Sequence, residues 1–118
     1  MGKINLRFKL ISDDDNLDIK TTGIKTENKI VYKENNITVT LLIFDNKIEM
    51  TRSCNEYKIN LVFEKNKKTI STYQVFGASK IFDLETKTKK FIISKNNIII
   101  NYELEGNNFS YSLEMEDL

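Results

Sequence analysis

The chain of 118 residues contains no histidine, no proline, no tryptophan and a single cysteine, Cys54. Without histidine it lacks the commonest general base and the commonest metal ligand of proteins. One cysteine excludes an intrachain disulfide framework and a cysteine metal cluster, and without a histidine partner Cys54 cannot form a protease-type dyad. We therefore expect no enzymatic activity, no metal and no cofactor. Acidic residues are plentiful, but no spacing selects a catalytic carboxylate pair.

The chain also has no excess of charge of either sign and no long run of apolar residues. The 18 basic and 17 acidic residues give a net charge of +1, which provides no whole-chain attraction to nucleic acid or to an anionic membrane. No segment approaches the roughly 18 apolar residues of a membrane span, and the N-terminus lacks a signal-peptide core. We therefore expect no membrane association and a cytoplasmic location. The heavy use of Asn, Lys and Ile suggests an AT-rich coding sequence and hence a bacterial source.

What the chain has in abundance is strict alternation of apolar and polar residues. Residues 98–116 show it best, because every second residue is apolar on either side of a turn at Gly106-Asn107-Asn108. A period of two indicates a strand with one buried and one solvated face. The apolar residues of this hairpin are Ile98, Ile100, Tyr102, Leu104, Phe109, Tyr111, Leu113 and Met115.

The same alternation of apolar and polar residues recurs along the whole chain and predicts about ten or eleven short strands. Polar turns separate them at intervals of roughly 8–12 residues, which is typical of an antiparallel sandwich or barrel. No segment has a sustained helical period, so we predict an all-β fold with little or no helix. Closure into an antiparallel up-and-down β-barrel leaves no exposed edges, and we predict one such domain over residues 1–118.

Four local features give more specific expectations. Gly23, inside a strand, indicates a bulge or a close backbone approach. Residues 37–44 are apolar on both faces, so this strand is either covered on both sides or contacts a second subunit. Residues 69–76 are expected to direct Ile70, Thr72, Gln74 and Phe76 to one face, and residues 86–89 are expected to form a turn.

A series of short signals occurs in a fixed order along the chain. They are Thr22-Gly23, Tyr32-Lys33-Glu34, Thr38, Arg52-Ser53, Val62-Phe63-Glu64 and the segment from Tyr73 to Gly77. In this order they resemble the YwiB-like family of small bacterial β-barrel proteins. They extend over nearly the whole chain. The resemblance implies a calycin- or lipocalin-like barrel. It implies no reaction, because that family has no established activity.

Arg52 is the sharpest candidate for a functional residue. It shares the phase of Ile48 and Met50, which points it to the apolar side, where an unpaired guanidinium is costly. One interpretation is an anchor for a carboxylate or phosphate in the mouth of the barrel. The alternative is a structural ion pair with a carboxylate such as Glu34.

Other polar residues in apolar phase could complete a ligand site inside the barrel. Such a site is mostly apolar with a few polar contacts, and the candidates are Arg52, Thr72, Gln74, Tyr102 and Tyr111. The alternative is an interior filled by its own side chains.

Two further motifs are interpreted as ordinary turns. Asp13-Asp14-Asp15 lacks the glycine and the distant glutamate of a calcium loop. The lysine-rich segments 65–68 and 87–90 could meet phosphates, but exposed lysines commonly protect strand edges and turns.

The sequence therefore favours a binding module for a small apolar or anionic ligand. The alternatives are a structural or protein-interaction module, acting through its outer surface or as a homodimer through residues 37–44, and weak nucleic-acid binding through the lysine turns.

Overall fold

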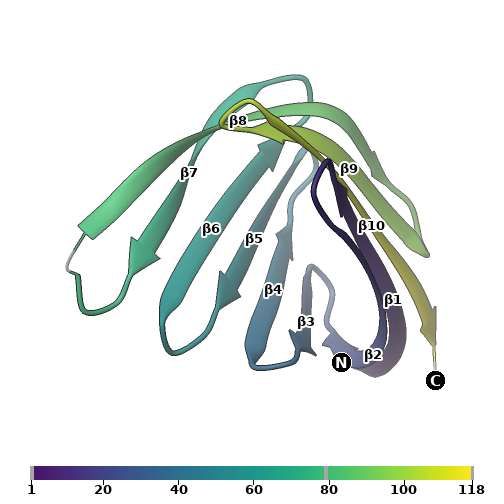
Figure 1. Cartoon of the computed structure of the whole chain (residues 1–118). Coiled ribbons are helices and arrows are strands. Elements are labelled where there is room, and N and C mark those ends of the chain that lie inside the picture. Colours follow the sequence, from purple (N-terminus) through teal and green to yellow (C-terminus); the bar gives the residue numbers. More distant parts are fainter. Residues whose placement is uncertain (1, 79, 118) are drawn as a thin grey trace.

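A computed structural model describes residues 2–78 and 80–117 and consists of ten antiparallel strands (Figure 1). No helix occurs among these residues. The strands are β1 (Gly2–Ser12), β2 (Asn16–Lys25), β3 (Lys29–Glu34), β4 (Ile37–Ile43), β5 (Lys47–Ser53), β6 (Tyr57–Glu64), β7 (Lys68–Val75), β8 (Lys80–Ile93), β9 (Asn97–Leu104) and β10 (Asn107–Asp117).

The strands form a closed barrel in which each pairs with its neighbours in sequence. The one pairing between strands distant in sequence joins β1 to β10, from Ile4↔Asp117 to Ser12↔Phe109. The prediction of an all-β antiparallel up-and-down barrel is confirmed. The part of the chain that the structure describes contains no helix long and apolar enough to cross a membrane.

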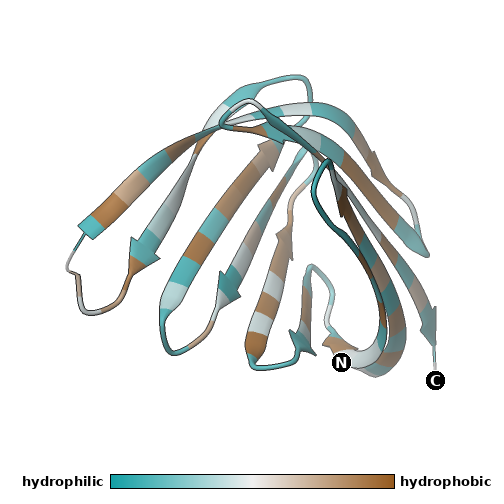
Figure 2. Cartoon of the chain, viewed as in Figure 1, coloured by the Kyte–Doolittle hydropathy of each residue, from teal (hydrophilic) through white to brown (hydrophobic). Residues whose placement is uncertain are grey.

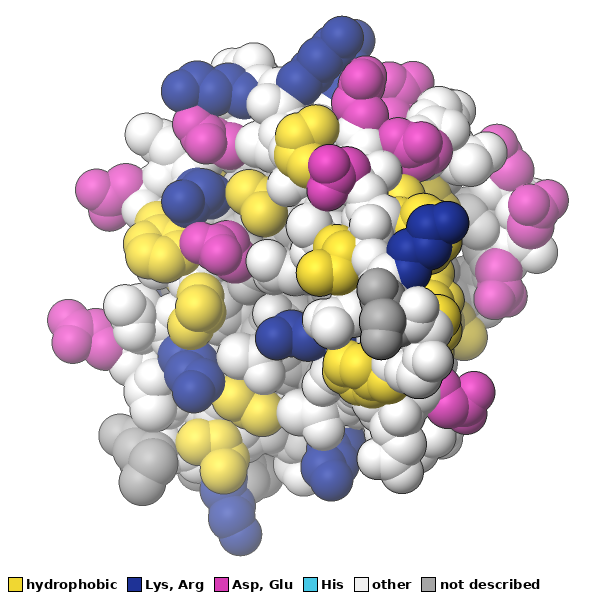
Figure 3. Space-filling model, turned by 90° about the vertical axis from the view of Figure 1, so that its left-hand side faces the viewer, with side chains coloured by type: hydrophobic (Ala, Val, Ile, Leu, Met, Phe, Trp, Pro, Cys, Tyr) yellow, Lys and Arg dark blue, Asp and Glu magenta, His cyan; other side chains and the backbone are white. Residues whose placement is uncertain are grey.

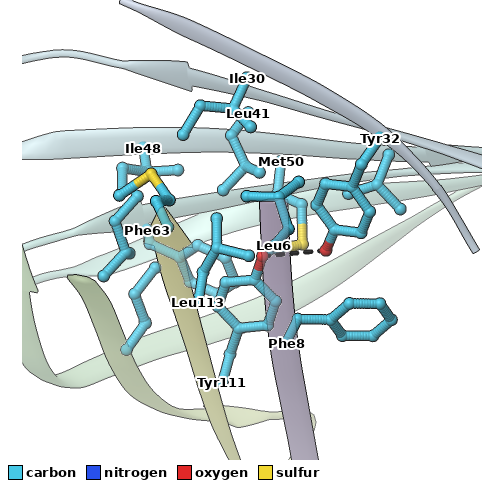
Figure 4. Close-up of a cluster of buried hydrophobic side chains, with 14 of the residues drawn as sticks. Leu6, Phe8, Ile30, Tyr32, Leu41, Ile48, Met50, Phe63, Tyr111 and Leu113 are labelled. Atoms are coloured by element: carbon cyan, nitrogen blue, oxygen red, sulfur yellow. Dashed lines mark hydrogen bonds between the residues drawn. The ribbon is translucent and has the colours of Figure 1, made fainter. Parts of the chain in front are cut away.

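Alternating side chains build the core, as the change of colour along each strand shows (Figure 2). Inward positions are apolar and buried, because each strand has one face toward the barrel interior and one toward solvent. Figure 4 shows the centre of this core, where side chains from opposite walls of the barrel meet. The large side chains that are almost wholly buried include Phe8, Ile30, Tyr32, Leu41, Ile48, Phe63, Ile98, Ile100, Tyr111 and Leu113.

The tight turns use residues that tolerate positive φ. Between β9 and β10 the turn is Glu105-Gly106, with φ of 49° and 85°, one residue earlier than the sequence suggested. Between β3 and β4, Asn35 has a φ of 56°. Such values suit the two-residue hairpin turns that match the twist of the flanking strands. The apolar residues of β9 and β10 that were expected to share a buried face do point into the barrel.

Gly23 marks a close backbone approach, which was one of the two expectations for it. A Cβ atom at this position would lie 2.6 Å from the Val31 carbonyl oxygen and 2.7 Å from Leu6 Cδ1. Both distances are well below van der Waals contact. The glycine therefore allows β2 to meet β3 where these strands begin to pair, at Gly23↔Tyr32.

Two predictions about β7 and β8 are wrong. On β7 the inward face carries Ser71 and Tyr73, whereas Ile70 is 59% exposed. Residues 86–89 form no turn, because β8 continues from Lys80 to Ile93 with a register shift between Thr88 and Lys90. Such a bulge bends a strand without ending it.

Hydroxyl groups explain the reversed phase of β7. Its backbone register with β6 ends at Asn60↔Thr72, and side chains continue the contact. The Val62 N–H donates to Ser71 Oγ at 3.0 Å, and the Thr69 hydroxyl donates to the Val62 carbonyl. Ser71 also shares a 2.6 Å hydrogen bond with Thr86. Small hydroxyl side chains are needed inside the barrel at this point, so the larger Ile70 lies outside.

Candidate functional site

One end of the barrel carries the turns that follow β3, β5 and β7, which lie side by side at the lower left of Figure 1. We call this end the mouth. Its inward positions are the last residue of β3, the last but one of β5, the first of β6 and the residues near the β7–β8 turn. They place Glu34, Arg52, Tyr57, Tyr73 and Phe82 at the same end of the barrel.

Arg52 forms an ion pair with Glu34 at the inner edge of the mouth. Arg52 Nη2 lies 2.5 Å from Glu34 Oε1, and the two side chains are 14% and 8% exposed. The strand between them, β4, pairs with both β3 and β5, so it fixes their separation. The inward direction predicted for Arg52 is confirmed, and its partner is the carboxylate that the sequence analysis named.

All five tyrosines of the chain occupy inward positions. The hydroxyls of Tyr32 and Tyr111 share a hydrogen bond of 2.9 Å across the core, drawn as a dashed line in Figure 4. Burial raises the pKa of Tyr32 and of Tyr102 to about 12, against the opposing effect of the positive charge of Arg52. Burial also raises the pKa of Tyr111 well above its usual value. These three hydroxyls are neutral structural groups at ordinary pH.

Three aromatic rings line the mouth beside the ion pair. The ring centroids of Tyr57 and Tyr73 are 5.9 Å apart, and those of Tyr73 and Phe82 are 6.2 Å apart in an edge-to-face arrangement. Tyr57 and Tyr73 are half-buried, whereas Phe82 is 42% exposed. Burial raises the pKa of Tyr57, which also responds to the charges of Arg52 and Glu34. The rings and the ion pair therefore form one site.

The five predicted site residues do not all meet at this site. Arg52, Tyr102 and Tyr111 face the interior. Thr72 and Gln74 share the outer face of β7 with Ile70, so placing them inside the barrel was wrong for the reason given above. Sequence reasoning missed Tyr57, Tyr73 and Phe82 as a group. Their signal was an aromatic residue beside a turn on three successive strands.

A buried row of hydroxyls lies along the inner faces of β7 and β8. Ser71, Thr86 and Thr88 are all buried. Among the described residues, Thr88 Oγ1 is a buried side-chain oxygen with no hydrogen-bond partner. This row was not predicted, because residues 86–89, in which threonines alternate with lysines, were expected to form a turn.

The remaining sequence motifs have structural roles. Asp15 closes the β1–β2 turn through a hydrogen bond of its N–H to Ser12 Oγ at 3.1 Å. Lys67 pairs with Glu64 at 2.8 Å and Lys89 with Glu103 at 3.2 Å, so acidic partners accompany the lysine turns. The described residues include no group of three or more His, Cys, Asp or Glu side chains placed to hold a metal ion.

Comparison with known proteins supports the fold and the family. The model of a family described as "Domain of unknown function (DUF1934)" matches residues 3–115. The chain belongs to this family. The crystal structure of the ywiB protein from Bacillus subtilis is similar with a TM-score of 0.79 and 19% sequence identity, covering 99% of this chain and 92% of that chain.

The family resemblance inferred from the sequence is thereby confirmed, and the barrel is consistent with a calycin-like fold. None of the curated proteins matches the chain. The family description names no ligand or reaction.

Proposed function

We propose that this protein binds a small ligand at the mouth of the barrel, between Arg52 and the rings of Tyr57, Tyr73 and Phe82. The observation that carries the proposal is the group of three partly exposed rings beside a nearly buried arginine. Aromatic side chains together with a few convergent polar groups are the usual lining of a small-ligand site. The deep interior is filled by core side chains (Figure 4), which favours the mouth over the centre.

The chemistry of the mouth suggests an aromatic or otherwise flat ligand with one anionic group. The three rings offer faces and edges on which a ring can stack. A guanidinium has five N–H donors in a planar fork, and the contact with Glu34 occupies one nitrogen. The remaining donors are suited to a carboxylate, sulfonate or phosphate.

We propose binding without catalysis, and a cytoplasmic location. The chain has no histidine. The pKa values of Tyr32, Tyr102 and Tyr111 are shifted away from neutrality by burial, so these groups are poor general acids or bases near pH 7.

Native mass spectrometry of protein purified gently from bacterial cells tests the proposal first. A discrete adduct is expected, and its mass gives the ligand class. Anilinonaphthalene sulfonate, which combines aromatic rings with an anionic group, is the defined probe for the same site. Its fluorescence should rise on binding, and Phe82→Ala should weaken the binding about tenfold, as expected for loss of a well-packed aromatic contact.

Ile81→Ala is the matched control. Ile81 precedes Phe82 on β8, is 61% exposed and faces outward, so its removal should leave the affinity unchanged. Arg52→Lys keeps a positive charge opposite Glu34 but loses the planar fork, so it should weaken binding while the chain stays folded. A bare protein mass together with no probe binding would refute the proposed function, as would equal effects of Phe82→Ala and Ile81→Ala.

A second candidate is an interaction through the outer surface of β4. Leu42 is exposed on this strand and Phe44 directly after it, and both face outward. Adjacent exposed apolar side chains are typical of contact surfaces. The side of the molecule shown in Figure 3, by contrast, has its apolar side chains interspersed with basic and acidic residues.

A further inference from the structure

The barrel wall is incompletely paired between β2 and β3. β1 pairs with β2 along its length, from Ile11↔Asn16 to Gly2↔Lys25. β3 pairs only with the last part of β2, from Gly23↔Tyr32 to Lys25↔Ile30. Among the described strands, residues 16–22 of β2 therefore pair on one side only. A surface groove of about 610 Å³, lined by Thr21, Thr22 and Lys33 among others, lies where the pairing stops.

The backbone of this edge offers hydrogen-bonding groups in a known order. The Ser12 N–H donates to the Asp15 carbonyl at 2.8 Å, which makes this pair a hydrogen-bonded one. Because such pairs alternate along antiparallel strands, Leu17, Ile19 and Thr21 direct their N–H and C=O groups to β1. The even-numbered residues, Asn16, Asp18 and Lys20, direct theirs to the open side.

The side chains of the edge are apolar on one face and charged on the other. Leu17 and Ile19 are half-buried on the inner face, whereas Asp18 and Lys20 are exposed on the outer face. Asp18 is held in place by Arg7, with nitrogen–oxygen distances of 2.9 and 2.8 Å. An edge strand of this kind is a template for pairing with another strand.

We propose that two copies of this chain pair through the open edge of β2, antiparallel, about a two-fold axis at Ile19. In this arrangement Asp18 of each copy lies opposite the partner's Lys20. The occupant is a second copy because the charge sequence of the edge complements itself. A two-fold interface requires this property, since the same surface is used by both subunits.

Charge repulsion disfavours the two alternative registers that differ from this one by a single step. Even-numbered residues must oppose even-numbered residues, because these carry the outward N–H and C=O groups. Shifting one way by a single allowed step places Asp18 opposite Asp18, and shifting the other way places Lys20 opposite Lys20. Like charges directly opposite each other are destabilising and opposite charges are stabilising. The two Ile19 side chains then face each other as a non-hydrogen-bonded pair, in which side chains approach most closely.

Sedimentation velocity over a wide concentration range tests the proposal with charge variants. Asp18→Lys and Lys20→Asp should each weaken self-association about tenfold or more, because two like-charged pairs replace two opposite ones. The double variant Asp18→Lys/Lys20→Asp should restore the dimer. An equimolar mixture of the two single variants should form a heterodimer, because each introduced charge meets its opposite.

Two further variants separate edge pairing from general charge effects. Lys58→Asp makes the same charge change as Lys20→Asp on an exposed residue of β6 and should leave the dimer intact. Lys20→Pro removes an N–H that points away from β1, so it should abolish pairing while the barrel still folds. A monomer at all concentrations would overturn the proposal. A dimer that survives the Asp18 and Lys20 variants but is lost in Phe44→Ser would overturn it too, and would place the interface on the outer surface of β4.

Discussion

Replacing Arg52 by methionine tests whether the ion pair at the mouth is needed for folding. The substitution keeps most of the apolar stem but leaves the Glu34 carboxylate, which is 8% exposed, without its partner. Removing one member of a buried pair costs about 3–5 kcal/mol, because an uncompensated charge remains inside the protein. The total stability of a domain is only about 5–15 kcal/mol.

The expected consequence is a large fall in thermal stability. For a chain of this length, each kcal/mol corresponds to roughly 4 °C in Tm, so Arg52→Met should lower Tm by about 10–20 °C. Circular dichroism during heating measures this shift. The double variant Glu34→Gln/Arg52→Met should recover most of the loss, because replacing both members of a buried pair is often nearly neutral.

Arg7→Met is the matched control, because Arg7 is the other arginine and also pairs with a carboxylate. That pair is about two-fifths exposed, at 40% and 42%, so its loss should change Tm little. The reasoning is refuted if Arg52→Met and Arg7→Met behave alike. It is also refuted if the double variant is as unstable as Arg52→Met alone.

Further predictions concern the β2–β3 contact and the tyrosines. Gly23→Ala should destabilise the barrel by about 1–3 kcal/mol in chemical denaturation, because the added methyl group overlaps a backbone oxygen of β3; Gly2→Ala, where a Cβ meets nothing within 4 Å, should be neutral. In a spectrophotometric titration, Tyr32 and Tyr102 should ionise only near pH 12 or on unfolding. Since folding raises their pKa values, the stability they contribute is present below about pH 10 and lost as the pH rises from there toward 12; ionisation of all five tyrosines together near pH 10 in folded protein would contradict the burial argument. Tyr111→Phe should destabilise by about 1–3 kcal/mol by leaving the Tyr32 hydroxyl unpaired, whereas changing both to Phe should cost less.

Period-two alternation predicted most of the fold because most strands bury an apolar face. It located the inward residues of β9 and β10 and the direction of Arg52, since each shares its phase with clearly apolar neighbours. It failed on β7, where both faces mix apolar and hydroxyl residues. There the interior requires hydroxyls, because Ser71 and Thr69 replace backbone pairing with β6. This requirement arises from the neighbouring strand and cannot be read from the alternation within residues 69–76.

The candidate site was predictable only in part, because its composition depends on how separate strands are arranged and not on the local pattern of residues. Arg52 stood out because a charge in apolar phase is rare, and Glu34 was named because it was the plausible acceptor. Tyr57 and Phe82 did not stand out, since aromatic residues in apolar phase are normally core, and Tyr73 was assigned to the opposite face of its strand. Their partial exposure arises from their position beside turns at one end of the barrel, which requires knowing where every strand ends.

The connectivity of the barrel also has a consequence for how the chain folds. Nine of the ten pairings join strands linked by a short turn, and the β1–β10 pairing alone joins opposite ends of the chain. Closing a loop of about 100 residues costs roughly 2 kcal/mol more entropy than closing one of about ten. We therefore expect the hairpins to form early as an open, curling sheet, and the β1–β10 junction to join late. The same junction should be where the barrel first opens when the protein unfolds.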